Sequence, residues 1–309
     1  MSSVHNLHSL IYEYAKARGI IYGICNADDL EGVSDEVLNI PFFRGGMIER
    51  ISPRMFLAGA KSIIVMGVKV ERAPVFEGLD RVMAASLCGA DYHKRLKCIA
   101  RELTSKMLES IEFKFRIQID SGPLIERAFA LRAGLGFIGK NKNLISPEFG
   151  SFFNIGLIVT DIEMNALKAA SASEPALRKY RLLNCGGCDL CLLSCPTKAL
   201  GEGGRFDYSR CISYLTQKKG VLSECEAAAV GVSIYGCDIC QTVCPHNLPF
   251  DVSISKESTQ RVLKNILDMD EGLIAYKLKD SCLLWRGPAF IRRNAAIALN
   301  NCRKTEKLN

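Results

Sequence analysis

The most restrictive feature of this chain is a run of four cysteines that ends in a proline, CGGCDLCLLSCP. The group comprises Cys185, Cys188, Cys191 and Cys195. Bacterial ferredoxins use this C-x2-C-x2-C-x3-C-P spacing, and the fourth cysteine of their run binds the other of two 4Fe–4S clusters. The run therefore predicts a cluster whose fourth ligand comes from elsewhere in the chain.

A second group repeats this spacing with one thiol missing, in the stretch CDICQTVCP. It comprises Cys237, Cys240 and Cys244, and a lone cysteine, Cys211, lies between the two groups. If the last cysteine of each group crosses to the other cluster, all eight thiolates have a place. One predicted cluster then has the ligands Cys185, Cys188, Cys191 and Cys244. The other has the ligands Cys195, Cys211, Cys237 and Cys240.

Zinc is the alternative occupant, because thiolates bind it as readily as they bind iron–sulfur clusters. Zinc sites usually need only C-x2-C pairs, and the C-x3-C-P endings have no role in them, so the spacing favours iron and sulfur. The remaining cysteines are scattered, and we expect small buried hydrophobic side chains at all of them except Cys88. They are Cys25, Cys88, Cys98, Cys225, Cys282 and Cys302.

The composition is that of a globular protein, with 48% hydrophobic and 24% charged residues in 309. Two or three domains fit this length, and a ferredoxin alone would need far less chain. We therefore expect the clusters to deliver electrons to the segment that precedes them. No apolar run reaches transmembrane length, and the first residues lack a secretory signal or a twin arginine, so we expect a cytoplasmic protein.

The net charge of +7 is spread unevenly. Residues 256–309 carry eleven Lys and Arg against six Asp and Glu. Such a segment is suited to contact phosphates, although a solvated basic surface is the ordinary explanation. The cations near the end of the sequence are Arg286, Arg292, Arg293, Arg303 and Lys304.

Apolar periodicity predicts alternating helices and strands before the cysteines, which is an α/β (α+β) pattern. The expected strands span 61–70, 113–120 and 150–162, and the expected helices span 3–18, 91–111 and 122–134. A polar stretch at 171–175 reads as a linker, and a strong amphipathic helix is expected at 289–301. We divide the chain into domains 1–170, 171–250 and 251–309.

The stretch GLGFIG (134–139) matches the G-x-G-x-x-G dinucleotide motif letter for letter. That motif must follow a strand and open a helix, whereas a predicted helix precedes it here. We interpret Gly134 as the end of that helix, and the other glycines as a tight turn with close backbone approach. A nicotinamide or flavin dinucleotide site is therefore not expected.

Several stretches, in order along the chain, resemble the epoxyqueuosine reductase family. They are ADYHKRL (90–96), IDSGPLIERAFALRAGLGFIGKNKNLISPEFGSFFNIG (119–156), the first cysteine group, RCISYL (210–215) and YGCDICQTVCPHN (235–247). The resemblance extends from about residue 7 to residue 302, nearly the whole chain. It implies a cobalamin-binding domain like that of reductive dehalogenases, then a ferredoxin-like domain, and then a short helical segment of HEAT type.

The activity that the resemblance implies is reduction of epoxyqueuosine to queuosine at the wobble position of tRNA. Two 4Fe–4S clusters would pass electrons to cobalamin, whose reduced cobalt acts on the substrate. An external donor such as a flavodoxin or a ferredoxin would supply these electrons. We expect a monomer that binds tRNA and no membrane.

The resemblance also implies that Asp120 supplies a proton during the reaction. Reductive cleavage of a C–O bond leaves an alkoxide-like oxygen, and a positioned acid lowers that cost. The alternative role for Asp120 is to cap the helix that follows it. An acid that works near neutral pH needs a raised pKa, so we predict that an apolar wall and the macrocycle desolvate Asp120.

Further residues are assigned to the cobalamin site by the resemblance alone. Arg50 would lie near the polar side chains of the corrin, although an ordinary surface charge is the alternative. Cys88 would lie near the cobalt, although burial in a core is the commoner fate of a thiol. His93 is not assigned as a cobalt ligand. Backbone N–H groups and short polar side chains that would meet the corrin amides are expected at Gly139, Lys140, Asn141 and Ser151.

The C-terminal part departs from the family, whose members often continue through several HEAT-type helices that hold tRNA. This sequence stops soon after Cys302, and a smaller basic surface predicts weaker binding to phosphates. A free nucleoside or another small epoxide thus stays open as the substrate. Two other functions also stay open: a reductive dehalogenase-like cobalamin protein, and an iron–sulfur electron-transfer protein whose N-terminal domain docks a partner.

Overall fold

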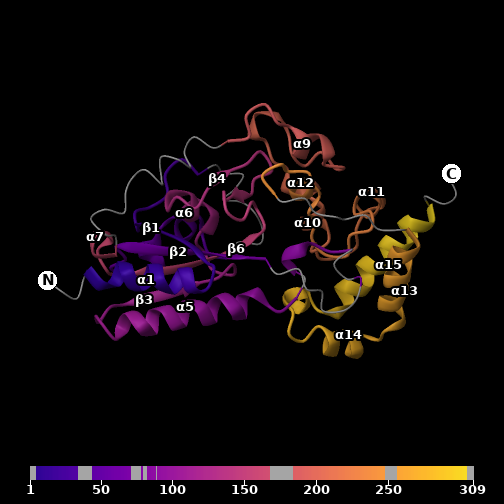
Figure 1. The fold of residues 1–309 in the computed structure, drawn as a ribbon. Coiled ribbons are helices and arrows are strands. Elements are labelled where there is room, and N and C mark those ends of the chain that lie inside the picture. Colours follow the sequence, from indigo (N-terminus) through magenta and orange to yellow (C-terminus); the bar gives the residue numbers. More distant parts are fainter. Residues whose placement is uncertain are drawn as a thin grey trace. The chain divides into compact units, whose positions relative to one another are not determined.

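A computed structural model describes residues 5–33, 44–70, 78, 82–87, 89–167, 184–247 and 256–304 (Figure 1). The chain forms two compact units. The first consists of Met1–Lys69 and Tyr92–Gly186, and the second consists of Val70–Asp91 and Gly187–Asn309. The first unit contains α1 (His5–Ala17), β1 (Ile21–Asn26), α3 (Met47–Ile51), α4 (Pro53–Phe56), β2 (Ser62–Lys69), α5 (Tyr92–Leu108), β3 (Phe115–Gln118), α6 (Glu126–Arg132), β4 (Phe137–Ile138), β5 (Leu144–Ile145), β6 (Phe153–Thr160) and α7 (Met164–Leu167). The second contains α9 (Leu190–Ser194), α10 (Ile212–Leu215), α11 (Glu224–Ala229), α12 (Ile239–Thr242), α13 (Lys256–Asp268), α14 (Glu271–Lys277) and α15 (Pro288–Lys304).

A four-stranded sheet forms the centre of the first unit, in the order β1-β2-β6-β3. Every neighbouring pair is antiparallel, and Ile64 of β2 lies opposite Ile24 of β1 and Ile158 of β6. The three predicted strands are present, and β1 was not predicted. Of the two class names given to this domain, α+β is therefore the appropriate one, because the helices connect antiparallel strands.

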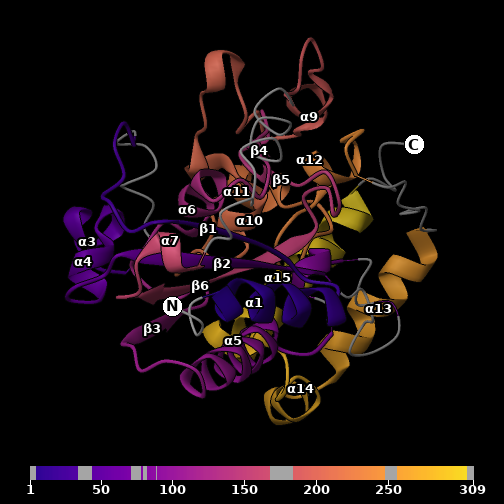
Figure 2. The same ribbon diagram turned by 60° about the vertical axis from the view of Figure 1, so that its left-hand side comes forward.

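The two faces of β2 pack against different helices, which explains its continuous apolar run. Ile64 and Met66 pack with α1 and α5, whereas Ile63 and Val65 pack with α6 on the other face. Figure 2 shows α1 and α5 together on one side of the sheet and α6 on the opposite side. Each large aliphatic side chain buried in this way contributes about 1.5–3 kcal/mol.

The glycine-rich stretch after α6 forms a hairpin and not a dinucleotide motif. Gly134 has φ of 80°, and its N–H bonds to the carbonyl of Leu131 at 3.0 Å, so it ends the helix as predicted. The chain then enters β4, which pairs with β5. A Cβ on Gly136 would lie 2.0 Å from the carbonyl oxygen of Ile145, so only glycine fits this position.

The second unit has two short helices that repeat each other, as the cysteine spacing does. α9 and α12 contact one another, and each begins directly after an aspartate. The backbone of Asp189 (φ −126°, ψ 16°) closely matches that of Asp238 (φ −115°, ψ 7°). The sequence repeat CD-x-C is thus also a repeat of local structure.

The C-terminal helices of this unit share one apolar core. Side chains of α13, α14 and α15 pack together, and α13 lies beside α15 (Figure 1). Val82 and Met83, distant in sequence, join the same core beside Ile234 and Tyr235. The predicted helix at 289–301 is confirmed and is somewhat longer. Within the described residues, none of the helices combines the length and apolar character of a membrane span.

The cysteines outside the two groups differ in their burial. Cys25 and Cys302 are buried in cores, as predicted. The same prediction is wrong for Cys98 and Cys225, which are exposed because they lie on the outer faces of α5 and α11. Cys88 lies outside the described residues, as does the predicted linker at 171–175.

Candidate functional site

Asp120 follows β3 and has a backbone conformation that is uncommon for its residue type. Its φ is 54°, in the left-handed region, and 61% of its side chain is exposed. The first two residues of α5 face it. The Tyr92 hydroxyl donates to Asp120 Oδ2 at 3.0 Å, and His93 Nε2 lies 3.2 Å from the same oxygen. These two partners were not predicted.

The structure bears on the alternative role of Asp120 as a helix cap and on its pKa in the protein alone. Asp120 does not cap the next helix, because α6 begins after Ile125, which is its N-cap. Its pKa is not raised by the protein alone. The surrounding protein partly desolvates the exposed carboxylate and acts to raise the pKa of Asp120, but hydrogen bonds and charge from His93, the hydroxyl of Tyr92 and the charge of Arg127 outweigh this effect. The net pKa therefore lies below the ordinary value of 3.8, and the carboxylate is ionised at neutral pH.

The loop between β3 and α6 is closed at its base by a side chain. Gln118 Nε2 donates to the carbonyl of Leu124 at 2.7 Å, and Gln118 Oε1 accepts from the N–H of Leu124 at 2.9 Å. Gly122 lies against this side chain, because an added Cβ there would be 2.1 Å from Gln118 Oε1. The loop that carries Asp120 is thus folded over a buried glutamine.

Glu126 lies in the first turn of α6, after the loop, and contacts the loop at Asp120. Its Oε1 accepts the backbone N–H of Asp120 at 2.6 Å, and Gln118 Nε2 lies 3.4 Å away. Burial and the nearby charge of Asp120 raise the pKa of Glu126 well above 4.5. Two carboxyl groups at one site therefore have pKa values that are shifted in opposite directions.

Arg127 and Arg50 connect α6 to other parts of the first unit. Arg127 donates to the carbonyl of Lys142, which lies in the turn between β4 and β5. The carbonyl of Arg50 accepts the N–H of Ile125 at 3.1 Å. The start of α6 thus links the Asp120 loop, the turn that contains Gly139–Asn141, and the helix that carries Arg50.

The turn after β4 places one predicted site residue against a predicted cluster ligand. The backbone N–H of Lys140 donates to Cys185 Sγ at 3.3 Å. Asn141 is buried, and its Oδ1 accepts the N–H of Asn143 at 3.1 Å. Ser151 is also buried, directly before β6. A Cβ on Gly139 would lie 2.5 Å from Ile145, so the turn packs closely on β5.

Five of the predicted ligands lie close together in the second unit. Cys191 and Cys195, from α9 and its end, are buried beside Cys211 and Cys240. The charge of Cys195 acts on Cys211 and on Cys237, and the charges of Cys211, Cys237 and Cys191 act on Cys240. The thiols at 191, 195, 211, 237 and 240 are therefore neighbours in space, and they include Cys191 of the other predicted set. Among the described residues, no three His, Cys, Asp or Glu side chains are grouped as one metal ion would require.

The pKa values of these thiols are shifted in different directions. Burial raises the pKa of Cys237 to about 12 and also raises the pKa of Cys211. Burial acts in the same direction on Cys195, but hydrogen bonds from Thr197, Leu200 and Ala199 outweigh it and lower its pKa. Buried thiols of this kind become thiolates when a cation or cluster binds them.

Part of the predicted basic C-terminal surface is used inside the chain. Arg293 donates to the carbonyls of Lys218 and Gly220, at 2.8 and 2.7 Å, and Arg292 donates to the carbonyl of Met269. Arg303 and Lys304, at the end of α15, are exposed. The number of cations free to contact phosphates is therefore smaller than the sequence indicates.

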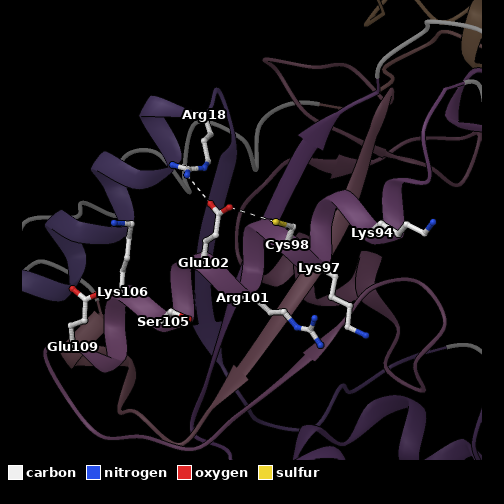
Figure 3. Close-up of a pocket in the computed structure, with 9 residues that line it drawn as sticks. All are labelled: Arg18, Lys94, Lys97, Cys98, Arg101, Glu102, Ser105, Lys106 and Glu109. Atoms are coloured by element: carbon white, nitrogen blue, oxygen red, sulfur yellow. Dashed lines mark hydrogen bonds and ion pairs between the residues drawn. The ribbon is translucent and has the colours of Figure 1, made fainter. Parts of the chain in front are cut away.

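An open hollow of about 760 Å3 lies on the outer face of α5, away from the predicted residues (Figure 3). Glu102 accepts hydrogen bonds there from Arg18 at 2.7 Å and from the Tyr14 hydroxyl at 3.0 Å, and therefore ties α1 to α5. The lining consists of Arg18, Lys94, Lys97, Cys98, Arg101, Glu102, Ser105, Lys106 and Glu109.

Comparison with known proteins identifies the cysteine region by family. Residues 184–247 match the family model of a 4Fe-4S double cluster binding domain. This range contains both cysteine groups and Cys211.

Relatives match over most of the chain. Epoxyqueuosine reductase of Lactococcus garvieae is 33% identical, and the match covers 90% of this chain and 82% of the relative. A solved epoxyqueuosine reductase with a tRNA-Tyr epoxyqueuosine-modified stem loop has 29% identity and a TM-score of 0.80, with 99% and 84% of the two chains covered. A Bacillus subtilis epoxyqueuosine reductase, solved with its catalytic aspartate loop swung out of the active site, has 29% identity and a TM-score of 0.78, with 99% and 84% covered.

Proposed function

The chain belongs to the epoxyqueuosine reductase family, and from this premise we propose that it reduces epoxyqueuosine to queuosine at the wobble position of tRNA. The observation that carries the proposal is the match over 82% of a curated relative, joined to a site where one carboxylate faces Tyr92 and His93. The relative solved with a modified tRNA stem loop supports tRNA as the substrate.

We propose two 4Fe–4S clusters on the crossed ligand sets. The proximity of Cys195, Cys211, Cys237 and Cys240 supports these four as one set, with Cys191 of the other set beside them. The other set is Cys185, Cys188, Cys191 and Cys244, and the match to a double cluster domain supports it. The Lys140 N–H donates to Cys185 Sγ, and such bonds to sulfur tune the potential of a cluster. An external flavodoxin or ferredoxin would supply the electrons to a monomeric enzyme.

Cobalamin is the second cofactor that we propose, held by the first unit. The short polar side chains of Asn141, in the turn after β4, and of Ser151 suit a ligand rich in side-chain amides. The residues that would hold the corrin are Arg50, Gly139, Lys140, Asn141 and Ser151, with Cys88 also proposed. When bound, the group supplies the electrons that open the epoxide.

Asp120 would supply a proton to the oxygen that leaves. Removal of the epoxide oxygen as water takes two electrons and two protons, and the C–O bonds break as the oxygen is protonated. In the protein alone His93 and Tyr92 hold the carboxylate ionised, so Asp120 must gain its proton at the site before it can act. Substrate and corrin would cover an exposed side chain and thereby raise its pKa.

Turnover by the purified protein tests this proposal. Oxygen-free protein, reconstituted with iron, sulfide and cobalamin, is mixed with a stem loop that contains epoxyqueuosine, and queuosine is measured by mass spectrometry. We expect turnover by the wild type and a loss of at least about 100-fold in Asp120→Asn. A matched control is Asp161→Asn, because Asp161 also follows a strand and accepts the N–H of Lys114 at 2.8 Å.

Two results would contradict the proposal. Full activity of Asp120→Asn would remove the proton donor, and protein that binds iron but no cobalamin would point to an electron-transfer protein instead.

A further inference from the structure

The N–H of Asp120 is held by a residue outside its own loop. We propose that Glu126 is a positioning residue, which fixes the main chain of Asp120 and thereby directs the carboxyl group toward Tyr92 and His93. The inference deepens the proposed function and rests on it, because it assigns a means of control to the same proton donor.

The backbone of Asp120 requires such support. A left-handed conformation is unfavourable for a residue with a Cβ, although aspartate tolerates it better than most. Among the described residues only Asp120, Lys142 and Lys198 adopt it without being glycine. Such a conformation persists where surrounding contacts determine it. Two contacts do so here: the N–H of Ser121 donates to the carbonyl of Ile119 at 2.6 Å, within the loop, and the N–H of Asp120 donates to Glu126 at 2.6 Å, from outside it.

The loop has two closures of different kinds. The bonds between Gln118 and Leu124 join the residues on either side of the loop, so they can persist while the loop moves. The bond to Glu126 ends on Asp120 itself, and it must break if Asp120 leaves the site. A Bacillus subtilis relative has been solved with its catalytic aspartate loop swung out. Glu126 is therefore placed to act as the latch of this movement.

The bond to Asp120 requires an oxygen acceptor at residue 126 and not a negative charge. A glutamine would accept the same N–H without carrying a charge beside Asp120. Burial and the charge of Asp120 raise the pKa of the glutamate well above its usual range, so the ionised form is costly here. Arg127, on the same helix, and Asp120 are the charged groups that act on this carboxyl, and Gln118 adds a neutral amide.

Hydrogen exchange of the loop amides in the full chain tests the latch without substrate. Exchange is followed by mass spectrometry on a peptide that spans residues 119–125. In Glu126→Ala we expect the Asp120 amide to exchange roughly tenfold faster or more, because its acceptor is lost. In Glu126→Gln we expect exchange close to that of the wild type, because an oxygen acceptor remains. Equal exchange in Glu126→Ala and wild type would overturn the proposal.

Kinetics of the reconstituted enzyme provide the second readout. Misplaced catalytic groups lower kcat, so Glu126→Ala should lose roughly 100-fold in kcat while its KM for the stem loop changes little. Glu126→Gln should restore most of the activity, and adding Glu126→Ala to Asp120→Asn should cost nothing further.

A loss that appears in KM alone, or one that Glu126→Gln shares, would contradict positioning. If the wild type itself does not reduce epoxyqueuosine, the proposed function fails, whereas the exchange result still decides the latch.

Discussion

At the scale of single residues, the site depends on two carboxyl groups whose pKa values the surrounding residues shift in opposite directions. Asp120 accepts from Tyr92 and lies beside His93, which lowers its pKa, whereas Glu126 is desolvated and lies near Asp120, which raises its pKa. Pairs of acids whose pKa values are pushed apart are typical of sites that store and transfer protons. The local geometry therefore agrees with acid chemistry, although the acid itself is ionised before ligands bind.

Glu126→Gln should change stability in a pH-dependent way. The folded pKa of Glu126 lies above its ordinary value of 4.5, so the folded state binds more protons than the unfolded state just above that pH. Wild-type stability should therefore fall as pH rises from 4.5 toward neutrality, and Glu126→Gln should not show this loss. The variant should be the more stable protein at pH 7 and equal to the wild type near pH 4. Urea denaturation across this range measures the difference, and an opposite slope would contradict the assignment.

At the scale of secondary structure, the β3–α6 connection is arranged around one buried glutamine. Gly122 leaves room for the Gln118 side chain, whose amide is bonded at both atoms and cannot move aside without losing those bonds. The sequence DSGP therefore describes a loop whose glycine is required by packing.

Gly122→Ala should weaken this loop. Its new methyl group would overlap the Gln118 side chain, and we expect a loss of about 1–3 kcal/mol in the free energy of unfolding. Gly46→Ala is a suitable control, because its Cβ would meet only Glu49 Oε2, at 3.8 Å. Urea denaturation compares the two variants. Equal stability in both would show that the clamp does not constrain the loop.

Helix α15 supports the chain between two predicted cluster ligands. Asn294 is fully buried, and its Nδ2 donates to the carbonyls of Thr216 and Ile234, at 2.7 and 2.8 Å. Thr216 follows the helix after Cys211, and Ile234 precedes Cys237. One side chain thus fixes the spacing of two segments that we propose to bind the same cluster.

Asn294→Ala should destabilise the protein and reduce its iron content. The carbonyl of Ile234 would lose its Asn294 donor, at about 1–3 kcal/mol, and the carbonyl of Thr216 would keep only the longer bond from Arg293, at 3.4 Å. Asn301→Ala is the control. Asn301 also lies on α15, but its Nδ2 donates to the carbonyls of Ala227 and Gly231, which are not in the segments that carry the predicted cluster ligands. Iron assays after reconstitution should show a deficit in Asn294→Ala and little change in Asn301→Ala. Full iron in both variants would contradict this role.

At the scale of the whole molecule, the sequence predicted three of the strands in the central sheet and the helices α1, α5, α6 and α15, but few of the contacts. The apolar run at 61–70 and the cysteine spacing carry strong local signals, because burial on two faces and cluster ligation both depend on residue type. Strand β1 was missed, since IYGICN is short and contains a glycine. Tyr92, His93 and Glu126 were missed as site residues because their role arises only when α5, the loop and α6 meet in space.

The division into units also could not be read from the sequence. Residues 70–91 interrupt the first unit, yet they belong to the second, where the N–H of Ile234 donates to the carbonyl of Val82 at 2.6 Å. This contact joins residues about 150 positions apart, and no hydrophobic periodicity in the sequence predicts it. The domain boundaries at 170 and 250 stay predictions.

The central claim is that this chain removes the epoxide oxygen of epoxyqueuosine in tRNA, with Asp120 as proton donor. Nucleoside mass spectrometry of tRNA from a deletion strain, complemented with wild type or Asp120→Asn, tests it most directly. We predict that epoxyqueuosine accumulates in the deletion strain, that the wild type converts it to queuosine, and that Asp120→Asn does not. Normal queuosine in a deletion strain with no second reductase would contradict the claim.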